Sequence, residues 1–127
     1  MEEFKISRND NEDVSVLKIG GFLDAHTAAH LENAFQTLVD EHRYKIIVNF
    51  SELNYISSAG LGVFMGFIEQ IRLNGGDIKM TNMTPKIFRV FDLLGFPTIF
   101  DIFDDESKAL NKYRKNTDRS ASENAGK

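Results

Sequence analysis

The run Lys-Ile-Ile-Val-Asn-Phe at residues 45–50 is the feature that most constrains the fold. In a strand, successive side chains point to opposite faces of the sheet, so this run presents apolar side chains to both faces. Strands of this kind are typical of parallel sheets that helices cover on each side. The chain is therefore expected to be a layered α/β protein with this strand deep inside its sheet.

Strand-like and helix-like segments alternate along the rest of the chain. Phe4 and Ile6 alternate with polar residues, and the apolar residues 14–19 follow a polar cluster, which predicts an N-terminal hairpin whose second strand ends at Gly20-Gly21. The later expected elements are a helix spanning the apolar positions 28–39, a loop over 51–57, a helix over 59–73, a strand over 77–80, a helix over 87–94, an edge strand over 100–103 and a final helix opening at 104–106. This order predicts a mixed β-sheet of four to five strands with about four α-helices, alternating β/α after the hairpin.

Composition limits the chain to one small domain with a tail. The 127 residues include no Cys, which excludes a disulfide framework, a thiolate zinc site and a cysteine nucleophile. The total net charge is −4. Residues 111–127 carry +3 of it, so residues 1–110 have a net charge of −7. Residues 116–127 contain no large apolar side chain, so we expect a domain over 1–113 and a disordered basic and polar tail over 114–127.

The same properties exclude several environments and partners. The acidic start Met1-Glu2-Glu3 does not resemble a signal peptide, and the longest mostly apolar stretch, 61–68, is far shorter than the roughly 20 residues of a membrane span. Mild overall acidity argues against direct nucleic-acid binding. A cytoplasmic protein without a membrane span is expected.

The sequence does not match the known catalytic and nucleotide-binding motifs that its glycines, serines and histidines partly resemble. A dinucleotide fingerprint needs glycine where the chain has Met65, and no Gly-Lys-Ser/Thr follows for a phosphate-binding loop. A nucleophile elbow needs glycine two residues before Ser58, where Ile56 stands. His26 and His30 are four residues apart on the expected helix but lack a metalloprotease pattern, so we expect exposed helix residues. No catalytic residue, metal site or cofactor is predicted.

The start of the helix expected at residue 59 is the remaining candidate site. Ser58 is expected at its N-cap, where a phosphate would meet unpaired amide groups and the positive end of the helix dipole. The small residues Ala59, Gly60 and Gly62 would let another protein approach closely. On the residues alone, the simpler interpretation is that Ser58 only caps the helix and the glycines only serve packing or turns.

Residues 55–63, Tyr-Ile-Ser-Ser-Ala-Gly-Leu-Gly-Val, resemble the Asp-Ser-Ser/Ala-Gly-Leu-Gly signature of the bacterial anti-sigma-factor antagonists, the STAS-domain proteins. The segment 21–27 is similar to the family's entry into its first helix, 46–51 to its central strand, and 74–76 to its turn after the second helix. The resemblance spans about residues 3–112 and implies the STAS fold.

The resemblance also implies a function in partner switching. In that family the unphosphorylated antagonist binds an anti-sigma factor, which is a serine kinase with a histidine-kinase-like ATPase fold, and releases the sigma factor. Phosphorylation weakens the complex, and a PP2C-type phosphatase reverses it. The matching phosphoacceptor is Ser58, with Ser57 the less favoured acceptor. The implied partner-binding residues are Asp24, Ser57, Ser58, Ala59, Gly60, Gly62 and Val63.

One departure from the family pattern concerns Ser57, which stands where the family usually has aspartate. The missing charge bears on the choice of kinase and on how strongly phosphorylation disfavours binding. Two alternatives remain open at this point. One is a STAS scaffold or regulatory subunit, stressosome-like or transporter-associated, without a phosphorylation cycle. The other is a protein that binds an anion or small ligand at the helix start.

Overall fold

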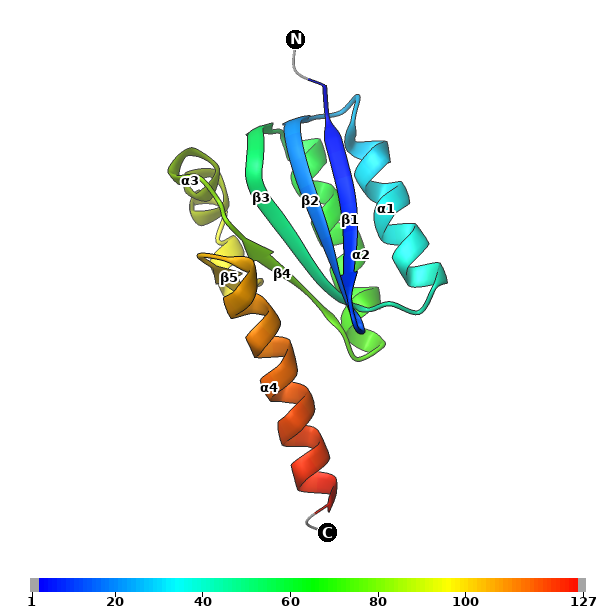
Figure 1. Cartoon of the computed structure of the whole chain (residues 1–127). Coiled ribbons are helices and arrows are strands. Elements are labelled where there is room, and N and C mark those ends of the chain that lie inside the picture. Colours follow the sequence, from blue (N-terminus) through cyan, green and yellow to red (C-terminus); the bar gives the residue numbers. More distant parts are fainter. Residues whose placement is uncertain (1–2, 126–127) are drawn as a thin grey trace.

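The strand expected at residues 45–50 lies in the middle of a five-stranded mixed sheet in the computed structural model, which describes residues 3–125 and side chains up to residue 115 (Figure 1). The elements in chain order are β1 (Lys5–Asn11), β2 (Val14–Leu23), α1 (Ala28–Asp40), β3 (Lys45–Ile56), α2 (Ser58–Leu73), β4 (Asp77–Thr81), α3 (Pro85–Leu93), the 3-10 helix η1 (Phe96–Thr98), β5 (Ile102–Phe103) and α4 (Glu106–Ala125). The sheet order is β1-β2-β3-β4-β5, in which β1 is antiparallel to β2 and the remaining pairs are parallel. The predicted α/β fold class is confirmed.

Helices cover both faces of the sheet, as the doubly apolar central strand requires. The larger core joins α1, α2, α3 and η1 to one face, where Ile46, Val48 and Phe50 of β3 are fully buried. On the other face Ile47 packs with α4 through Ala109. The alternation of these four β3 residues between two cores explains why the sequence run has no polar face.

Tyr113 anchors α4 to the sheet. Its buried hydroxyl oxygen lies 3.1 Å from the Ile46 amide nitrogen, 2.7 Å from the Ile46 carbonyl oxygen and 2.6 Å from the Asp77 carbonyl oxygen. Burial is the main cause that raises the pKa of Tyr113 well above its ordinary value. The phenol therefore stays protonated and can donate a hydrogen bond to one of these carbonyls.

The second strand continues past the glycine pair at which the sequence predicts its end. β2 reaches Leu23, and its register with β3 shifts around Gly20 and Gly21. Gly21 has a φ of +81°, and a Cβ there would lie 2.1 Å from the Glu3 carbonyl oxygen. The glycines therefore mark an irregularity within the strand rather than its end.

The loop predicted over residues 51–57 is also wrong for most of its length. β3 continues to Ile56, and both Leu53 and Ile56 are buried in the larger core. The side chains between them are exposed, which is why the segment has the polar composition of a loop. The extension carries the end of β3 seven residues beyond Asn49, the last β3 residue that pairs with β4.

Helix α4 continues to Ala125 through most of the segment 114–127 that is predicted to be a disordered tail. Its first turns are held by the buried residues Ala109 and Tyr113, and an established helix adds further turns at little cost. Residues 126–127 lie outside the described residues. The domain boundary at residue 113 stays a prediction.

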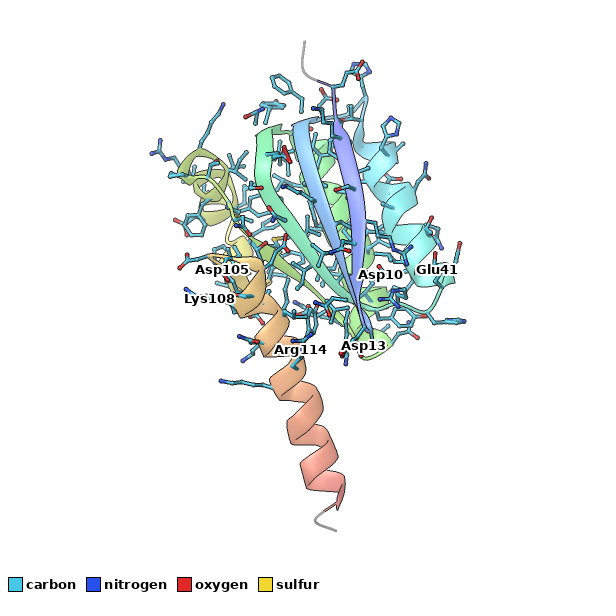
Figure 2. The ribbon with its side chains drawn as sticks, viewed as in Figure 1. Asp10, Asp13, Glu41, Asp105, Lys108 and Arg114 are labelled. Carbon is cyan, nitrogen blue, oxygen red and sulfur yellow. The ribbon has the colours of Figure 1, made fainter. Side chains whose placement is uncertain are left out.

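Arg8 ties β1 to the end of α1 near the edge of the sheet. Its guanidinium donates to the Asp10 carboxylate at 2.9 and 3.0 Å and to the Glu41 carboxylate at 3.0 and 2.7 Å. Figure 2 labels these two acidic residues on β1 and just after α1. The hydrogen bonds from Arg8 hold the pKa values of both carboxyls below their ordinary range.

Lys79 is the one buried basic residue among the described side chains, and two carboxylates compensate its charge. Its ammonium donates to Asp77 at 2.9 Å and to Asp101 at 2.8 Å, and it lies 4.8 Å from the centre of the Tyr113 ring. The hydrogen bond from Lys79 lowers the pKa of the Asp101 carboxyl below its ordinary 3.8. The pair therefore stabilises the fold above the pKa of the unfolded carboxyl and stops doing so as the pH falls through the lower folded value.

We expect Asp101→Asn to lower the free energy of unfolding at pH 7 by about 1.5 kcal/mol, because a charge-assisted hydrogen bond to a buried ammonium is lost. The variant should also lose less stability than the parent as the pH falls from 5 to 3, because it has no carboxylate to protonate at this position. Urea unfolding at several pH values measures both. Asp104→Asn is the matched control, since its exposed pair with Lys108 is worth little. Equal losses in the two variants would contradict the role given to Lys79.

Candidate functional site

The carboxyl ends of β2 and β3 lie side by side and bring the predicted site residues to one end of the sheet (Figure 1). Leu23 pairs with Ile56, the last residue of β3, and the Ser57 amide donates to the Leu23 carbonyl at 2.9 Å. Asp24 follows the end of β2 directly, and Ser58 lies two residues beyond the end of β3. The structure thus brings Asp24 and Ser58 to the same end of the sheet.

Ser57, not Ser58, is the N-cap of α2. Its backbone is extended, with φ −98° and ψ 173°, and its hydroxyl oxygen accepts from the Gly60 amide at 3.4 Å. The Leu61 amide donates to the Ser57 carbonyl at 3.0 Å. The sequence prediction is off by one position because β3 runs straight into the helix, which leaves no loop between them.

Ser58 is the first residue of α2 and is exposed to solvent. Among the described residues its hydroxyl has no hydrogen-bond partner, whereas the Ser57 hydroxyl is engaged by the helix. Amide groups in the first turn of a helix have no acceptor within the helix, and the dipole is positive there. The Ser58 oxygen is therefore the accessible nucleophile at this turn, in a place that accepts added negative charge.

Two residues predicted to contact a partner are buried instead. Val63 is 4% exposed and belongs to the larger core. Gly60 is also buried, and a Cβ there would lie 2.7 Å from Leu23 Cγ, so its small size lets α2 seat against the end of β2. Neither offers a surface to another protein. Ala59 and Gly62 are exposed, and a Cβ at Gly62 would meet nothing within 4 Å.

Asp24 organises the turn between β2 and α1. Its Oδ1 accepts from the His26 amide at 2.9 Å and from the Thr27 amide at 3.2 Å, and its own amide donates to the Thr27 hydroxyl at 2.9 Å. Thr27 is the N-cap residue of α1, so Asp24 is a near neighbour of the cap. The carboxylate is half-buried and held in one orientation beside the strand ends.

Sequence reasoning missed an aromatic pair beside the site. Phe22 and Tyr55 are partners in the parallel pairing of β2 and β3, their ring centres are 5.6 Å apart, and they are 37% and 44% exposed. Phe22 also lines a hollow of about 480 Å³ together with Asp24 and His26. The sequence holds no clear signal for this pair, because the expected strands end before Phe22 and Tyr55 and the register of β2 with β3 brings the two rings together.

The two histidines that are four residues apart do not share a helix. His26 lies in the turn before α1, whereas His30 is inside α1 and exposed. Within the described residues, no three His, Asp or Glu side chains gather closely enough to hold a metal ion. Over the same residues, no helix is both long and apolar enough to cross a bilayer.

A comparison of the sequence with known protein families identifies the family of this domain. The model of the STAS domain matches residues 5–109, which include all five strands and the first three helices. The chain belongs to the STAS domain family. The resemblance predicted from residues 55–63 is thereby confirmed at the level of the family.

Several proteins similar to this STAS domain are named anti-sigma factor antagonists. The chain is 29% identical over 112 residues to the anti-sigma F factor antagonist of Paenibacillus polymyxa, with 85% of this chain and 93% of the relative covered. The crystal structure of an anti-sigma factor antagonist from Mycobacterium paratuberculosis superposes with a TM-score of 0.81 at 23% identity, covering 88% and 95% of the two chains. The phosphorylated form of the Bacillus cell fate determinant SpoIIAA has a TM-score of 0.68 at 22% identity, covering 87% and 99%. At these identities the two structures show a shared fold.

Two glycines of α2 in this STAS domain should respond oppositely to alanine. Gly60→Ala should lower the free energy of unfolding by about 1 to 3 kcal/mol, because its Cβ would collide with Leu23. Gly62→Ala should raise it by up to about 1 kcal/mol, because alanine favours the helix and the space is open. Urea unfolding of both variants measures the two shifts. A stabilised Gly60→Ala would show that α2 does not seat on the end of β2 as described.

Proposed function

We propose that this STAS protein is an anti-sigma-factor antagonist that switches partners through phosphorylation of Ser58. The observation that carries the proposal is the exposed Ser58 hydroxyl, which lies without a partner in the described residues at the first position of α2. Membership of the family and a relative that is an anti-sigma F factor antagonist support it. The protein acts in the cytoplasm as a ligand and a kinase substrate, without catalysing a reaction itself.

The proposed partners are those of a switching cycle. An anti-sigma factor that is also a serine kinase, with a histidine-kinase-like ATPase fold, binds the unphosphorylated protein and releases its sigma factor. The kinase then phosphorylates Ser58 and the complex weakens. A PP2C-type phosphatase removes the phosphate and restores binding.

The docking surface comprises exposed or half-buried residues at the carboxyl ends of β2 and β3. It consists of Asp24, Ser57, Ser58, Ala59 and Gly62, with the aromatic pair Phe22 and Tyr55 beside them. Exposed aromatic rings supply large contact area when a partner covers them. The open surface at Gly62 allows a partner's backbone to approach α2 closely.

The phosphate acts by charge and by bulk in the middle of this surface. It adds about −1.5 to −2 charges at a position that a bound partner would cover. The first turn of α2 tolerates this charge because of its free amides and dipole, so the domain stays folded while the interface is lost. Asp24 holds a second negative charge at the same end of the sheet, and its carboxylate repels the phosphate.

Ser57 sets this chain apart at the neighbouring position. Since its hydroxyl accepts from the Gly60 amide, it performs the capping task that an aspartate there would also perform, without the charge. The unphosphorylated surface is thus less negative than one with aspartate, and the charge added at Ser58 accounts for a larger share of the change. This engagement of the hydroxyl also makes Ser57 the poorer acceptor.

Incubation with the cognate kinase and ATP tests the acceptor directly. We expect one phosphate per chain on Ser58 by peptide mass spectrometry, none on Ser58→Ala and the same stoichiometry on Ser57→Ala. Ser57→Ala also reports on the cap, and its free energy of unfolding should fall by about 1 kcal/mol. An unmodified Ser58 in a mixture where the kinase binds normally would refute the switch.

Charge-mimic variants test the mechanism. Ser58→Asp should bind the anti-sigma factor more than tenfold more weakly than Ser58→Ala in a calorimetric titration, and both should stay folded because position 58 is exposed. Ser57→Asp is the matched control, since it adds the same charge one residue away while keeping the cap and restoring the family pattern. Equal affinities of Ser58→Asp and Ser58→Ala would contradict repulsion as the cause. A stable large assembly without phosphate turnover would instead favour the scaffold function.

A further inference from the structure

The contact between α4 and the sheet is smaller than the core on the opposite face. In the described side chains, α4 contributes no residue to the larger core, and its buried residues in the smaller one are Ala109 and Tyr113. The sheet supplies Val14, Val16 and Ile47 to that smaller core. Figure 1 shows the later turns of α4 projecting beyond the strands. Since hydrophobic stabilisation is roughly proportional to the apolar area removed from water, α4 is held less firmly than α1 or α2.

Much of the sheet surface that α4 covers is polar. Asn49, Lys79 and Thr81 are 6%, 3% and 0% exposed. Ile47 and Asn49 are two residues apart in β3 and share a face of the sheet, which is the face covered by α4. Lys79 and Thr81 are their partners in β4 and share this face as well. Closing α4 over the sheet therefore removes polar groups from water together with apolar ones.

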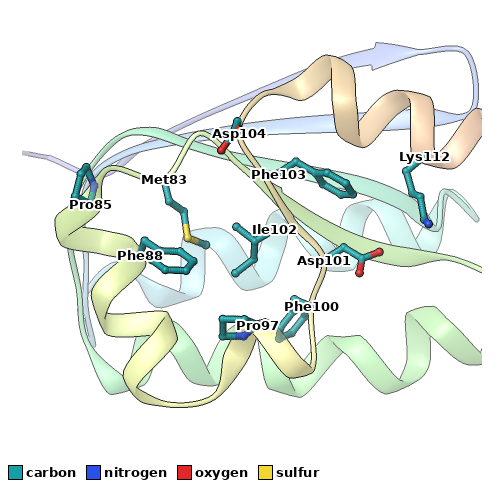
Figure 3. A pocket seen from close by; sticks show the side chains of 10 residues that line it. All are labelled: Met83, Pro85, Phe88, Pro97, Phe100, Asp101, Ile102, Phe103, Asp104 and Lys112. Carbon is teal, nitrogen blue, oxygen red and sulfur yellow. The ribbon is translucent and has the colours of Figure 1, made fainter.

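The Thr81 hydroxyl is buried and has no hydrogen-bond partner among the described residues. Phe103 of β5 pairs with Thr81 and packs against the smaller core, whereas Ile102 points to the opposite side of the strand (Figure 3). A buried hydroxyl without a partner destabilises the folded state, because its hydrogen bonds to water are lost. Water that enters beneath α4 would restore such a bond and would also hydrate Lys79 and Asn49. Separation of α4 from the sheet is thereby made easier.

A short link joins α4 to the sheet. Only Asp104 and Asp105 lie between the end of β5 and the start of α4, and Figure 3 labels Asp104 in this link. Asp105 caps the helix, because its Oδ1 accepts from the Lys108 amide at 3.0 Å. Asp104 is exposed, and its carboxylate pairs with the Lys108 ammonium at 3.2 Å. Both acidic side chains therefore bond to α4 and can move with it.

Polar contacts connect α4 to β3 at two places. The Asn49 side-chain amide donates to the Glu106 carboxylate at 2.5 Å. The Ile46 backbone amide donates to the Tyr113 hydroxyl oxygen at 3.1 Å. Because water can replace both hydrogen bonds once α4 moves away, each contributes only modestly to holding the helix.

We propose that α4 is a strap that opens from the sheet as a unit, turning at Asp104 and Asp105, while the larger core stays folded. Opening exposes Val14, Val16 and Ile47 to solvent, so the closed and open forms present different surfaces at this face of the sheet. Elements held by few buried apolar contacts are those that open at a lower free energy than global unfolding. The strap is such an element.

The strap is independent of the proposed switch. α4 covers the part of the sheet around Ile47, whereas Ser58 lies beyond the carboxyl end of β3. The larger core, which includes residues of both α2 and the sheet, stays folded in the open form. Opening is measured on the isolated chain without a kinase, so failure of the switch and failure of the strap are separate results.

Thiol labelling of single-cysteine variants tests the opening, because the chain has no Cys. Ile47→Cys places the thiol beneath α4 and Val48→Cys places it in the larger core, and both positions are 0% exposed. Iodoacetamide at low concentration reacts at a rate that reports the open population. Ile47→Cys should label about a hundredfold faster than its own global unfolding in urea allows, and Val48→Cys only at the rate that its global unfolding sets. Val16→Cys and Leu17→Cys form the equivalent pair on β2 and decide the question if Ile47→Cys does not fold.

Second substitutions separate local opening from global unfolding. Ile68→Val weakens the larger core and should speed labelling of Val48→Cys about fivefold without changing that of Ile47→Cys. Tyr113→Phe removes the hydroxyl that binds β3 and should speed labelling of Ile47→Cys about fivefold. Thr81→Val removes the unpartnered hydroxyl at nearly constant shape and should slow that labelling about threefold.

Any of four results would overturn the proposal. The first is labelling of Ile47→Cys at the rate of its global unfolding, and the second is an equal acceleration of Ile47→Cys and Val48→Cys by Ile68→Val. The others are labelling of Ile47→Cys that Tyr113→Phe leaves unchanged and labelling that Thr81→Val leaves unchanged. The first two would mean that α4 separates only when the whole domain unfolds.

Discussion

The parallel pairing of β2 with β3 up to Leu23 and Ile56 is the constraint on which the rest of the molecule depends. The Ser57 amide extends this pairing by one hydrogen bond to the Leu23 carbonyl, and α2 begins at the next residue. Because Gly60 is buried against Leu23, the first turn of α2 packs against the sheet in one fixed position. The position of the Ser58 hydroxyl therefore follows from strand register rather than from a flexible loop.

The neighbouring polar groups of the candidate site have different structural roles. The Ser57 hydroxyl and the Asp24 carboxylate are engaged by backbone amides and hold two turns in place. Ser58, with no partner in the described residues, is exposed on that rigid frame. In the proposed function, phosphorylation of Ser58 would change the charge of the surface without removing a hydrogen bond on which the fold depends. The proposed switch would therefore stay folded in both states.

Much of the fold follows from local patterns. The helical spacing of Leu31, Phe35 and Leu38 and the doubly apolar run over 45–50 suffice to predict α1, β3 and an α/β sheet. The errors lie where tertiary contacts outweigh composition. The segment 51–56 has the polar composition of a loop but stays in the sheet, because Leu53 is buried in the larger core. From the sequence, the pair Gly20-Gly21 is expected to end β2, but it is an irregularity within that strand.

The candidate site divides in the same way. The amino-acid sequence by itself determined the family, the serine pair and the glycine-rich helix start, because these depend on residue types at fixed spacing. Only the tertiary structure decided that Ser57 caps while Ser58 is exposed, that Val63 and Gly60 are buried, and that Phe22 and Tyr55 form an exposed pair. The physical reason is that exposure and hydrogen bonding depend on which atoms distant segments bring together, and spacing along the chain does not specify those contacts.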